Sequence, residues 1–134
     1  MFMLTMAGGM NMAFPDVCKT PVLGVPVPIP YPDISFSATT APAAFNVLVD
    51  CTPALNQSSE GLVSVGDDAG LELGLVSEDI SGETVYLVGC ITIFVDGVPA
   101  QRLTSMTGQN AAGVLPNAPG TCVCPSQCTV LALG

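Results

Sequence analysis

Histidine is absent from this chain of 134 residues, and positive charge is scarce. Without histidine, the chain lacks the side chain that most often serves as a general acid or base near neutral pH. Lys19 and Arg102 are its two cations against eleven acids, which gives a net charge of −9. Two cations cannot neutralise many phosphates, so nucleic-acid binding is disfavoured. The same scarcity argues against docking on anionic lipid.

No segment meets the requirements of a membrane span or a secretory leader. The longest apolar stretches fall well short of the roughly 20 residues that a spanning helix needs. The apolar start, residues 1–9, has no Lys or Arg before it and so lacks the charged region of a signal peptide. We therefore expect a protein that is made in the cytoplasm, has no stable membrane insertion and forms one domain over residues 1–134.

The motifs of common enzyme classes are also missing. The sequence holds no Ser-His-Asp set, no Cys-His pair and no Gly-rich phosphate loop. Its acids gather in two runs, Asp67–Asp68 with Glu72 and Glu78–Asp79 with Glu83. Carboxylates can bind Ca²⁺, but neither run forms an EF-hand loop, so we interpret both as loop residues. The sequence therefore predicts a protein that is not an enzyme.

Apolar residues, proline and glycine are what the chain has in abundance. It is 49% hydrophobic and 10% charged, whereas an ordinary soluble domain has roughly 25% charged residues. Twelve Pro and fourteen Gly are spread along the chain, and both are poor helix formers. The apolar runs are short, β-branched and bounded by turn residues, which predicts an all-β protein with few or no helices. The apolar surplus predicts a partner interface.

A proline-rich segment covers residues 13–33, where Val, Ile and Tyr alternate with Pro from Val25 to Pro32. Each Pro fixes its own φ and biases the preceding residue toward extended backbone. Because Pro cannot donate to a sheet, we expect a rigid extended strap laid on the body of the protein, and no central strand. A ligand for a proline-binding partner domain is the alternative interpretation.

Three further runs predict strands, at residues 45–56, 84–96 and 129–133, and residues 66–70 predict a turn. Two of these runs contain an internal repeat, because residues 45–54 align with residues 91–100. Each copy reads as a strand, a turn that begins with Asp, and a Pro-Ala pair. The pairs are Pro53–Ala54 and Pro99–Ala100.

Six cysteines leave three interpretations open. An even number in a short chain allows disulfides in an oxidising compartment. Thiolates alone can bind zinc, although the spacing of the C-terminal cysteines is not a strong zinc pattern. Buried cysteines can also serve as small hydrophobic side chains. The zinc candidates are Cys122, Cys124 and Cys128, with Cys18, Cys51 or Cys90 as a fourth ligand.

Several motifs resemble one protein family. Residues 95–102 (Val-Asp-Gly-Val-Pro-Ala-Gln-Arg) resemble the Pro-Ala-Ala-Arg motif of PAAR-repeat proteins, with Gln101 in place of the second Ala. Phe-Pro-Asp-Val-Cys at 14–18, Pro-Ile-Pro-Tyr-Pro at 28–32 and residues 125–131 are similar to a PAAR-like branch. The likeness, to spike-tip proteins of type VI secretion and related contractile injection systems, covers nearly the whole chain. Its motif residues are Phe14, Pro15, Asp16, Pro53, Ala54, Pro99, Ala100 and Arg102.

This resemblance implies a compact β cone with rough internal three-fold repetition. Its broad base would cap the blunt end of a trimeric VgrG-like β-helical spike, one copy per trimer, and its apex would sharpen the spike for membrane puncture. An effector or adaptor is a further implied partner, and the apparatus would deliver the protein outside the cell or into a target cell. Arg102 is then a structural residue, which we expect to pair with a carboxylate or with backbone carbonyls.

The sequence departs from the family at its metal site. PAAR tips generally hold zinc with His and Cys near the apex, but this chain reads Thr107-Gly108-Gln109-Asn110 where relatives tend to run Thr-His-Asn. The usual zinc site cannot exist here, which leaves zinc on cysteines or no cofactor. The alternative function is a secreted or surface adhesive β-domain stapled by disulfides.

Overall fold

Proline and glycine divide the chain into twelve strands and one short 3-10 helix in the computed structural model, which describes residues 1–113 and 115–134. The helix is η1 (Ser37–Thr39). Among the described residues, no helix is long and apolar enough to cross a membrane. The strands are β1 (Met10–Val22), β2 (Val25–Phe36), β3 (Thr40–Ala41), β4 (Ala44–Val49), β5 (Thr52–Ala54), β6 (Glu60–Gly61), β7 (Ser64–Val65), β8 (Thr84–Val88), β9 (Cys90–Val95), β10 (Val98–Ala100), β11 (Met106–Gln109) and β12 (Ala118–Cys124).

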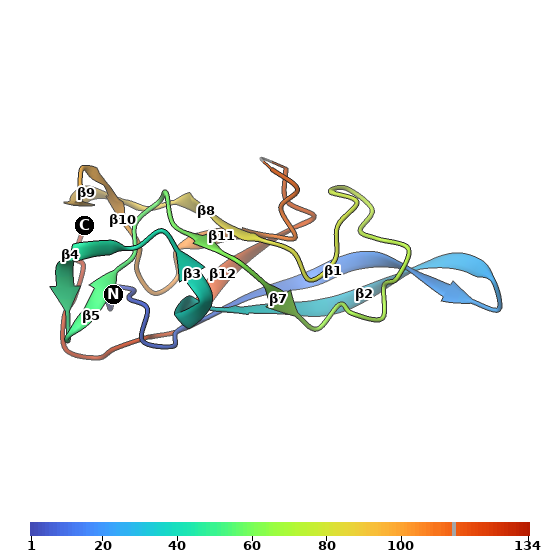
Figure 1. The fold of residues 1–134 in the computed structure, drawn as a ribbon, viewed down its shortest axis with the longest axis horizontal. Helices are drawn as coiled ribbons and strands as arrows, with labels where there is room; N and C mark the ends of the chain where they lie inside the picture. The colour runs from blue at the N-terminus through green and yellow to red at the C-terminus, as the bar shows by residue number, and fades with distance from the viewer. Residues whose placement is uncertain (114) are drawn as a thin grey trace.

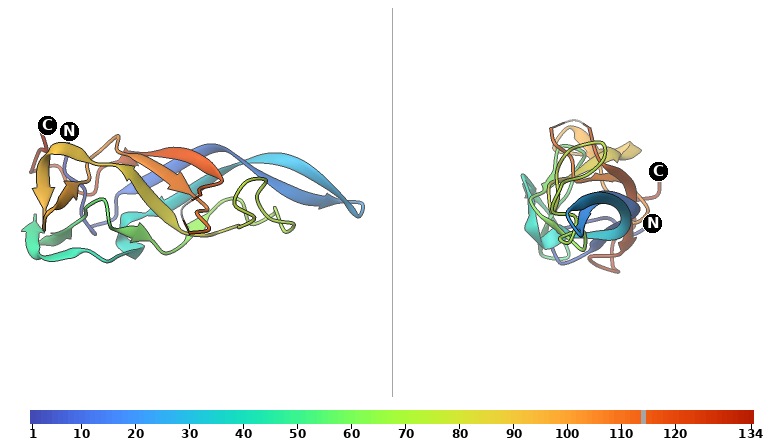
Figure 2. Two further views of the ribbon diagram at one scale, coloured as in Figure 1. Left: turned by 90° about the horizontal axis from the view of Figure 1, so that it is seen from above. Right: turned by 90° about the vertical axis from the view of Figure 1, so that its right-hand side faces the viewer.

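The strands build an elongated cone, which confirms the expected all-β architecture (Figure 1). Both termini and the strands β4, β5, β9 and β10 lie at the broad end, and the far part of the β1–β2 hairpin forms the narrow end. Seen from the narrow end, the hairpin lies within the outline of the other elements (Figure 2). One sheet of eight strands, in the order β3-β6-β8-β11-β12-β1-β2-β7, joins the two ends.

The proline-rich segment forms the β1–β2 hairpin. Its prolines at 26, 28, 30 and 32 alternate, so their missing N–H groups all face the same side of β2. Lys19, which pairs with Pro28, sends its own N–H outward to the carbonyl of Leu73 at 2.9 Å. Lys19 and Pro28 thus form a non-hydrogen-bonded pair, and the prolines cost the hairpin no ladder bond.

One sequence expectation about this segment needs correction. The segment is extended, as predicted, but it runs beyond the body of the protein instead of lying on it (Figure 1). Although β1 and β2 are interior strands of the large sheet, β12 and β7 pair only with their proline-free ends, Met10–Ala13 and Ile34–Ser35. The proline-rich stretch between these ends pairs as a two-stranded hairpin, as expected of a segment that cannot be a central strand.

The predicted strand at 84–96 is broken in two at Gly89. Residues before the break enter the large sheet as β8, and those after it form β9 of a separate hairpin. A Cβ at Gly89 would lie 2.7 Å from the Cβ of Pro99 and 3.0 Å from its carbonyl oxygen, so only glycine fits at this corner. The predicted last strand at 129–133 is reduced to a single bridge between Phe2 and Leu131, whereas the predicted turn at 66–70 is present.

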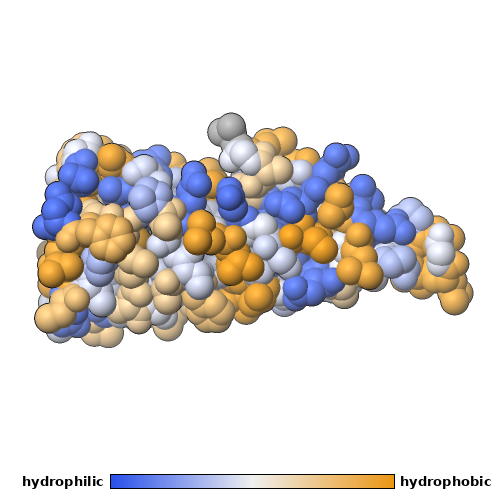
Figure 3. Space-filling view, in the orientation of Figure 1, coloured by the Kyte–Doolittle hydropathy of each residue, from blue (hydrophilic) through white to orange (hydrophobic). Residues whose placement is uncertain are grey.

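The apolar core is small and occupies two adjoining clusters. The first consists of Met3, Ala44, Val49, Ala54, Cys90, Val95, Ala100 and Ala132. The second consists of Leu4, Leu55, Tyr86 and Cys122. Many large apolar side chains are instead exposed, along the molecule and at its narrow tip, where Leu23 is 100% exposed (Figure 3). The hydrophobic surplus of the sequence therefore lies largely on the surface.

Candidate functional site

The two repeat copies fold as matching hairpins at the broad end. In β4–β5, Leu48 pairs with Pro53 and Val49 with Thr52. In β9–β10 the register is the same, since Phe94 pairs with Pro99 and Val95 with Val98. Burial along the strands also follows one pattern, with only the first and last residues of β4 and β9 buried. The sequence repeat is therefore a structural repeat.

Each hairpin closes on a two-residue turn with left-handed backbone. The φ angles are 51° at Asp50 and 63° at Cys51 in the first copy, and 57° at Asp96 and 79° at Gly97 in the second. Two positive φ values match the twist of a tight antiparallel hairpin, and Asp-Gly is a favoured pair for such a turn. Cys51 takes up this conformation without the freedom of glycine.

The N-terminal and C-terminal segments of the chain supply a third, similar edge. Phe2 bridges Leu131 in antiparallel fashion. The amide of Met3 donates to the carbonyl of Val130 at 3.0 Å, and the amide of Ala132 donates to that of Met1 at 2.7 Å. Phe2 thus occupies the place of Pro53 and Pro99, and Leu131 that of Leu48 and Phe94.

A closed ring of backbone hydrogen bonds relates the three edges. The amide of Leu4 donates to Gln101 O at 2.8 Å, that of Gln101 to Leu55 O at 3.0 Å, and that of Leu55 to Leu4 O at 3.0 Å. A second set repeats the pattern two residues further on. Its bonds are Met6 N to Pro53 O at 3.1 Å, Gln57 N to Pro99 O at 2.9 Å and Leu103 N to Phe2 O at 2.8 Å. The broad end has internal three-fold repetition, as predicted.

Each edge turns small residues inward and large apolar residues outward. The inward set, such as Ala54, Ala100 and Ala132, is at most 1% exposed, which lets the three edges approach the axis closely. The outward set comprises Phe45 (70% exposed), Leu48 (62%), Ile91 (80%), Phe94 (59%), Leu131 (50%) and Leu133 (75%). We call this outward set the broad face. Large exposed apolar patches mark interaction sites, so the broad face is a candidate contact surface.

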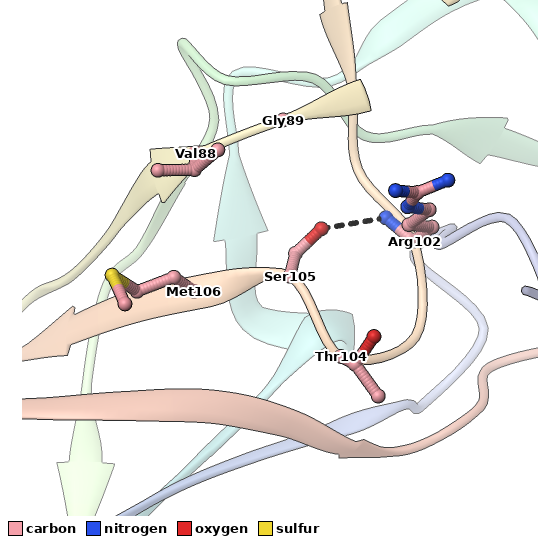
Figure 4. Close-up of a pocket in the computed structure, with 6 residues that line it drawn as sticks. All are labelled: Val88, Gly89, Arg102, Thr104, Ser105 and Met106. Carbon is pink, nitrogen blue, oxygen red and sulfur yellow. Dashed lines mark hydrogen bonds between the residues drawn. The ribbon is translucent and has the colours of Figure 1, made fainter. Parts of the chain in front are cut away.

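A shallow pocket lies beside Arg102 on the flank of the broad end (Figure 4). Its volume is about 210 Å³, and its lining residues are Val88, Gly89, Arg102, Thr104, Ser105 and Met106. The hydroxyl of Ser105 accepts the Arg102 amide at 3.0 Å. The guanidinium points away from the other labelled side chains (Figure 4). Among the described residues, no acid or thiol lines the pocket.

Comparison with known proteins identifies the family. The Tox-PAAR-like family, whose description is "Toxin PAAR-like domain", matches residues 9–116. The chain belongs to the Tox-PAAR-like family. PAAR-like domains are associated with the spike tips of type VI secretion systems and with toxins, and such domains are not typically enzymes. No curated protein and no solved structure matches the chain.

The structure brings most of the motif residues of this PAAR-like chain together. Pro53–Ala54 and Pro99–Ala100 stand at equivalent positions of two edges. Arg102 follows the second pair, and its guanidinium donates to the carbonyls of Ala132, at 3.2 Å, and Gly134. It therefore pairs with backbone carbonyls, one of the two roles expected from the sequence, and holds the third edge in place.

Phe14, Pro15 and Asp16 lie elsewhere, at an irregularity of β1 between Ala13 and Asp16. Phe14 is exposed, whereas Asp16 is fully buried. Because these residues are on the hairpin and not at the broad face, the two groups of motif residues serve different parts of the PAAR-like fold.

The zinc candidates are not gathered into one site. All six cysteines are free thiols, and among the described residues no group of three metal-ligating side chains includes Cys122, Cys124 or Cys128. Burial raises the pKa of Cys122 to about 11, which opposes thiolate formation. Cys18 lies apart, beside buried carboxylates. Three cysteines are buried and three exposed, and zinc on cysteines stays a prediction.

Sequence reasoning missed the third edge and the burial of two acids, Asp33 and Asp67. The third edge is built by residues 1–3 and 128–133, which are at opposite ends of the sequence and form no contiguous repeat. Its only signal was the final apolar run Thr129–Leu133. Asp33 gave no signal, because a single acid after a proline run reads as a solvated residue, yet it is fully buried.

Proposed function

We propose that this PAAR-like protein is a structural tip that caps a trimeric VgrG-like β-helical spike, one copy per trimer. The observation that carries the proposal is the set of three similar edges joined by the ring of Leu4, Leu55 and Gln101 backbone hydrogen bonds. A single chain that sits on the axis of a trimer meets three identical surfaces. Only a chain with internal three-fold repetition can offer each of them a similar edge.

The composition of the broad face supports the same proposal. Its outward residues are apolar, and Phe45 and Phe94 are aromatic residues of the kind that dominate binding energy at interfaces. Removing these side chains from water on docking would stabilise a complex by the hydrophobic effect. Acids occur at the two turns, as Asp50 and Asp96, where they can form a polar rim around an apolar centre.

The construction of the narrow end, which lies opposite the broad face, supports a mechanical role for it. The prolines of the β1–β2 hairpin restrict the unfolded chain and block new strands from pairing along the edge of β2. In this proposal the hairpin sharpens the spike for membrane puncture. The apparatus would carry the tip out of the cell or into a target cell, together with any recruited effector or adaptor, and the protein itself performs no catalysis.

Native mass spectrometry tests the proposal. The purified protein is mixed with a trimeric VgrG-like spike, and the expected species contains one copy per trimer. Replacing Phe45 and Phe94 together by Asp should weaken the complex about 100-fold or more, because two aromatic anchors are lost. The matched control replaces Leu71 and Leu75 by Asp, since both are exposed in the loop after β7 and outside the broad face.

Each outcome bears on the proposal. All variants must first show the circular dichroism of the native protein. If the Phe45 and Phe94 double variant still caps the trimer as tightly, another surface makes the contact. If the native protein binds no trimer, or binds it with three copies, the spike-tip assignment fails for that partner.

A further inference from the structure

Three carboxylates from separate parts of the chain meet inside the protein, away from the broad face. Asp16 comes from β1, Asp33 from β2 and Asp67 from the loop after β7. All three residues are 0% exposed. One carboxylate oxygen of each lies within 4.8 Å of one from each of the others. The cluster joins both strands of the hairpin to the loop that packs beside them.

Two of these carboxylates are held by hydrogen-bond donors. The side-chain amide of Asn110 donates to Asp16 Oδ2 at 2.8 Å and to Asp67 Oδ2 at 2.6 Å. Asp16 also accepts from Asn117 Nδ2, and Asp67 accepts from the amide of Ser81 at 3.2 Å. These donors fix the direction in which both carboxylates point.

The Cys18 thiol lies next to the same two carboxylates, with Sγ 3.7 Å from Asp16 Oδ1 and 3.8 Å from Asp67 Oδ2. Burial, followed by the charges of Asp16 and Asp67, raises the pKa of Cys18 to about 12. The thiol donates toward both carboxylates, so the carboxylate oxygens are the ligand atoms that the cluster offers.

Asp33 is held less well, since neither of its buried carboxylate oxygens forms a hydrogen bond of normal geometry in the described part of the chain. Neither Lys19 nor Arg102 donates a hydrogen bond to any of the three acids within residues 1–113 and 115–134. An ionised carboxylate that is buried without a partner is strongly destabilising. Burial raises the pKa of Asp33 to about 7, and the lowering effect of the nearby Ser64 hydroxyl and Ile34 amide does not offset it.

We propose that Asp16, Asp33 and Asp67 bind one hard divalent cation of the calcium class. This cation is the partner that the buried Asp33 carboxylate lacks. Hard cations take oxygen ligands, and Ca²⁺ does so at 2.3–2.6 Å, which places its ligands up to about 5 Å apart. The three carboxylate oxygens, which all lie within 4.8 Å of one another, fit that range. Asn110 and Asn117 then act as outer donors that orient ligating carboxylates.

The site differs from a zinc site of His and Cys ligands in place and in chemistry. Its role is also separate from capping, because it ties β1, β2 and the loop after β7 together at the root of the hairpin. A bound cation there stiffens the narrow end without touching the broad face. The proposal therefore stands or falls independently of the spike-tip function.

Metal analysis and thermal unfolding test the site in the full-length protein. We expect the native protein, incubated with CaCl₂ and desalted, to retain one calcium per chain in native mass spectrometry. Its Tm should rise by roughly 10 °C between EDTA and a 100-fold excess of Ca²⁺ over Kd, because a ligand that binds only the folded state stabilises it. MgCl₂ and ZnCl₂ are run in parallel.

Asp33→Asn supplies the discriminating variant. It removes one ligand charge and should abolish the calcium shift, while its Tm in EDTA should equal or exceed that of the native protein because a repelling charge is lost. Asp50→Asn makes the same change at an exposed turn and should keep the shift. If Asp33→Asn does not fold, calcium retention by the native protein still decides the matter.

Three results would overturn the proposal. They are the absence of retained calcium and of any Tm shift in the native protein, a calcium shift of equal size in Asp33→Asn, and a response to Zn²⁺ alone. None of them depends on spike binding, so failure of this site is distinguishable from failure of the capping function.

Discussion

The broad and narrow halves of the molecule are built on opposite principles. The broad end repeats one small motif three times around an axis and packs small apolar residues, such as Ala54 and Ala100, beneath it. The narrow half has no repetition, and its interior is polar, with Asn11, Asp33 and Asn110 all at most 1% exposed. Symmetry suits a surface that must fit a trimer, whereas specific buried hydrogen bonds suit a hairpin that must hold one direction.

This contrast shows that hydropathy alone does not locate the interior of such a protein. Among the described residues, Leu4 and Leu55 are the only apolar members of the group of largest fully buried side chains, and the others are polar. The apolar residues that make the sequence so hydrophobic lie mostly at the broad face, the loops and the narrow tip (Figure 3). Backbone hydrogen bonding and buried polar contacts therefore carry much of the specificity of the fold.

The largest effect is expected in the narrow half, from Asn110→Ala. This substitution leaves two buried carboxylates without their shared donor and removes the acceptor of the Gly82 amide. It also puts Ala at φ 50°, where Asn is better tolerated. We expect a loss of about 3–5 kcal/mol in the free energy of unfolding in EDTA, measured by urea denaturation.

Asn46→Ala is the control for that prediction, placed at the broad end. Asn46 is exposed and donates one hydrogen bond to Asp96 at 3.2 Å, so its loss should change the free energy of unfolding by less than about 0.5 kcal/mol. Equal effects of the two substitutions would mean that the polar interior of the narrow half does not carry the stability ascribed to it.

The sequence predicted the broad end better than the narrow half. Proline and glycine placement predicted an all-β chain, and the matching residues at 45–54 and 91–100 predicted two equivalent hairpins, because turn and strand preferences are local. The third edge could not be found in this way, since it is assembled from segments that meet only in the folded protein.

The carboxylate cluster escaped sequence reasoning for the same physical reason. Asp16, Asp33 and Asp67 are far apart in the chain, and each has an ordinary local explanation as a motif, strand or loop residue. Asp67 was interpreted as a solvated loop acid, yet it is fully buried because the loop after β7 folds back over the hairpin. The expectation that the prolines keep residues 13–33 from being a central strand fits the pairing, because β12 and β7 pair with Met10–Ala13 and Ile34–Ser35, of which Ala13 alone lies in that segment.

A smaller effect is expected at the third edge of the broad end, from Arg102→Ala. The change removes the guanidinium bonds to the carbonyls of Ala132 and Gly134, which tie this edge to its neighbour. We expect a loss of about 1–2 kcal/mol in the free energy of unfolding, because hydrogen bonds from charged donors are stronger than neutral ones. Hydrogen exchange should speed up at the amides of Met3 and Ala132 before it does so at Leu55.

Arg102→Lys separates geometry from charge at this position. Lysine keeps the positive charge but replaces the guanidinium, whose Nη1 donates to both carbonyls, by an ammonium of different geometry, so its effect should lie between those of the native protein and Arg102→Ala. Unchanged thermal stability in Arg102→Ala would contradict the role of this residue in holding the third edge.

The smallest effect, and the only stabilising one, is expected from Cys51→Gly, which makes the first hairpin turn like the second. Cys51 holds φ at 63°, a conformation that Gly97 adopts freely at the equivalent position. Relief of this strain, less the extra entropy that glycine gives the unfolded chain, should raise the free energy of unfolding by about 0.5 kcal/mol. Cys51→Ser removes the thiol but keeps the side chain, and should leave stability unchanged under reducing conditions. Stabilisation by both variants would trace the effect to the thiol. Stabilisation by glycine alone would show that the β4–β5 and β9–β10 hairpins differ in the backbone strain of their turns.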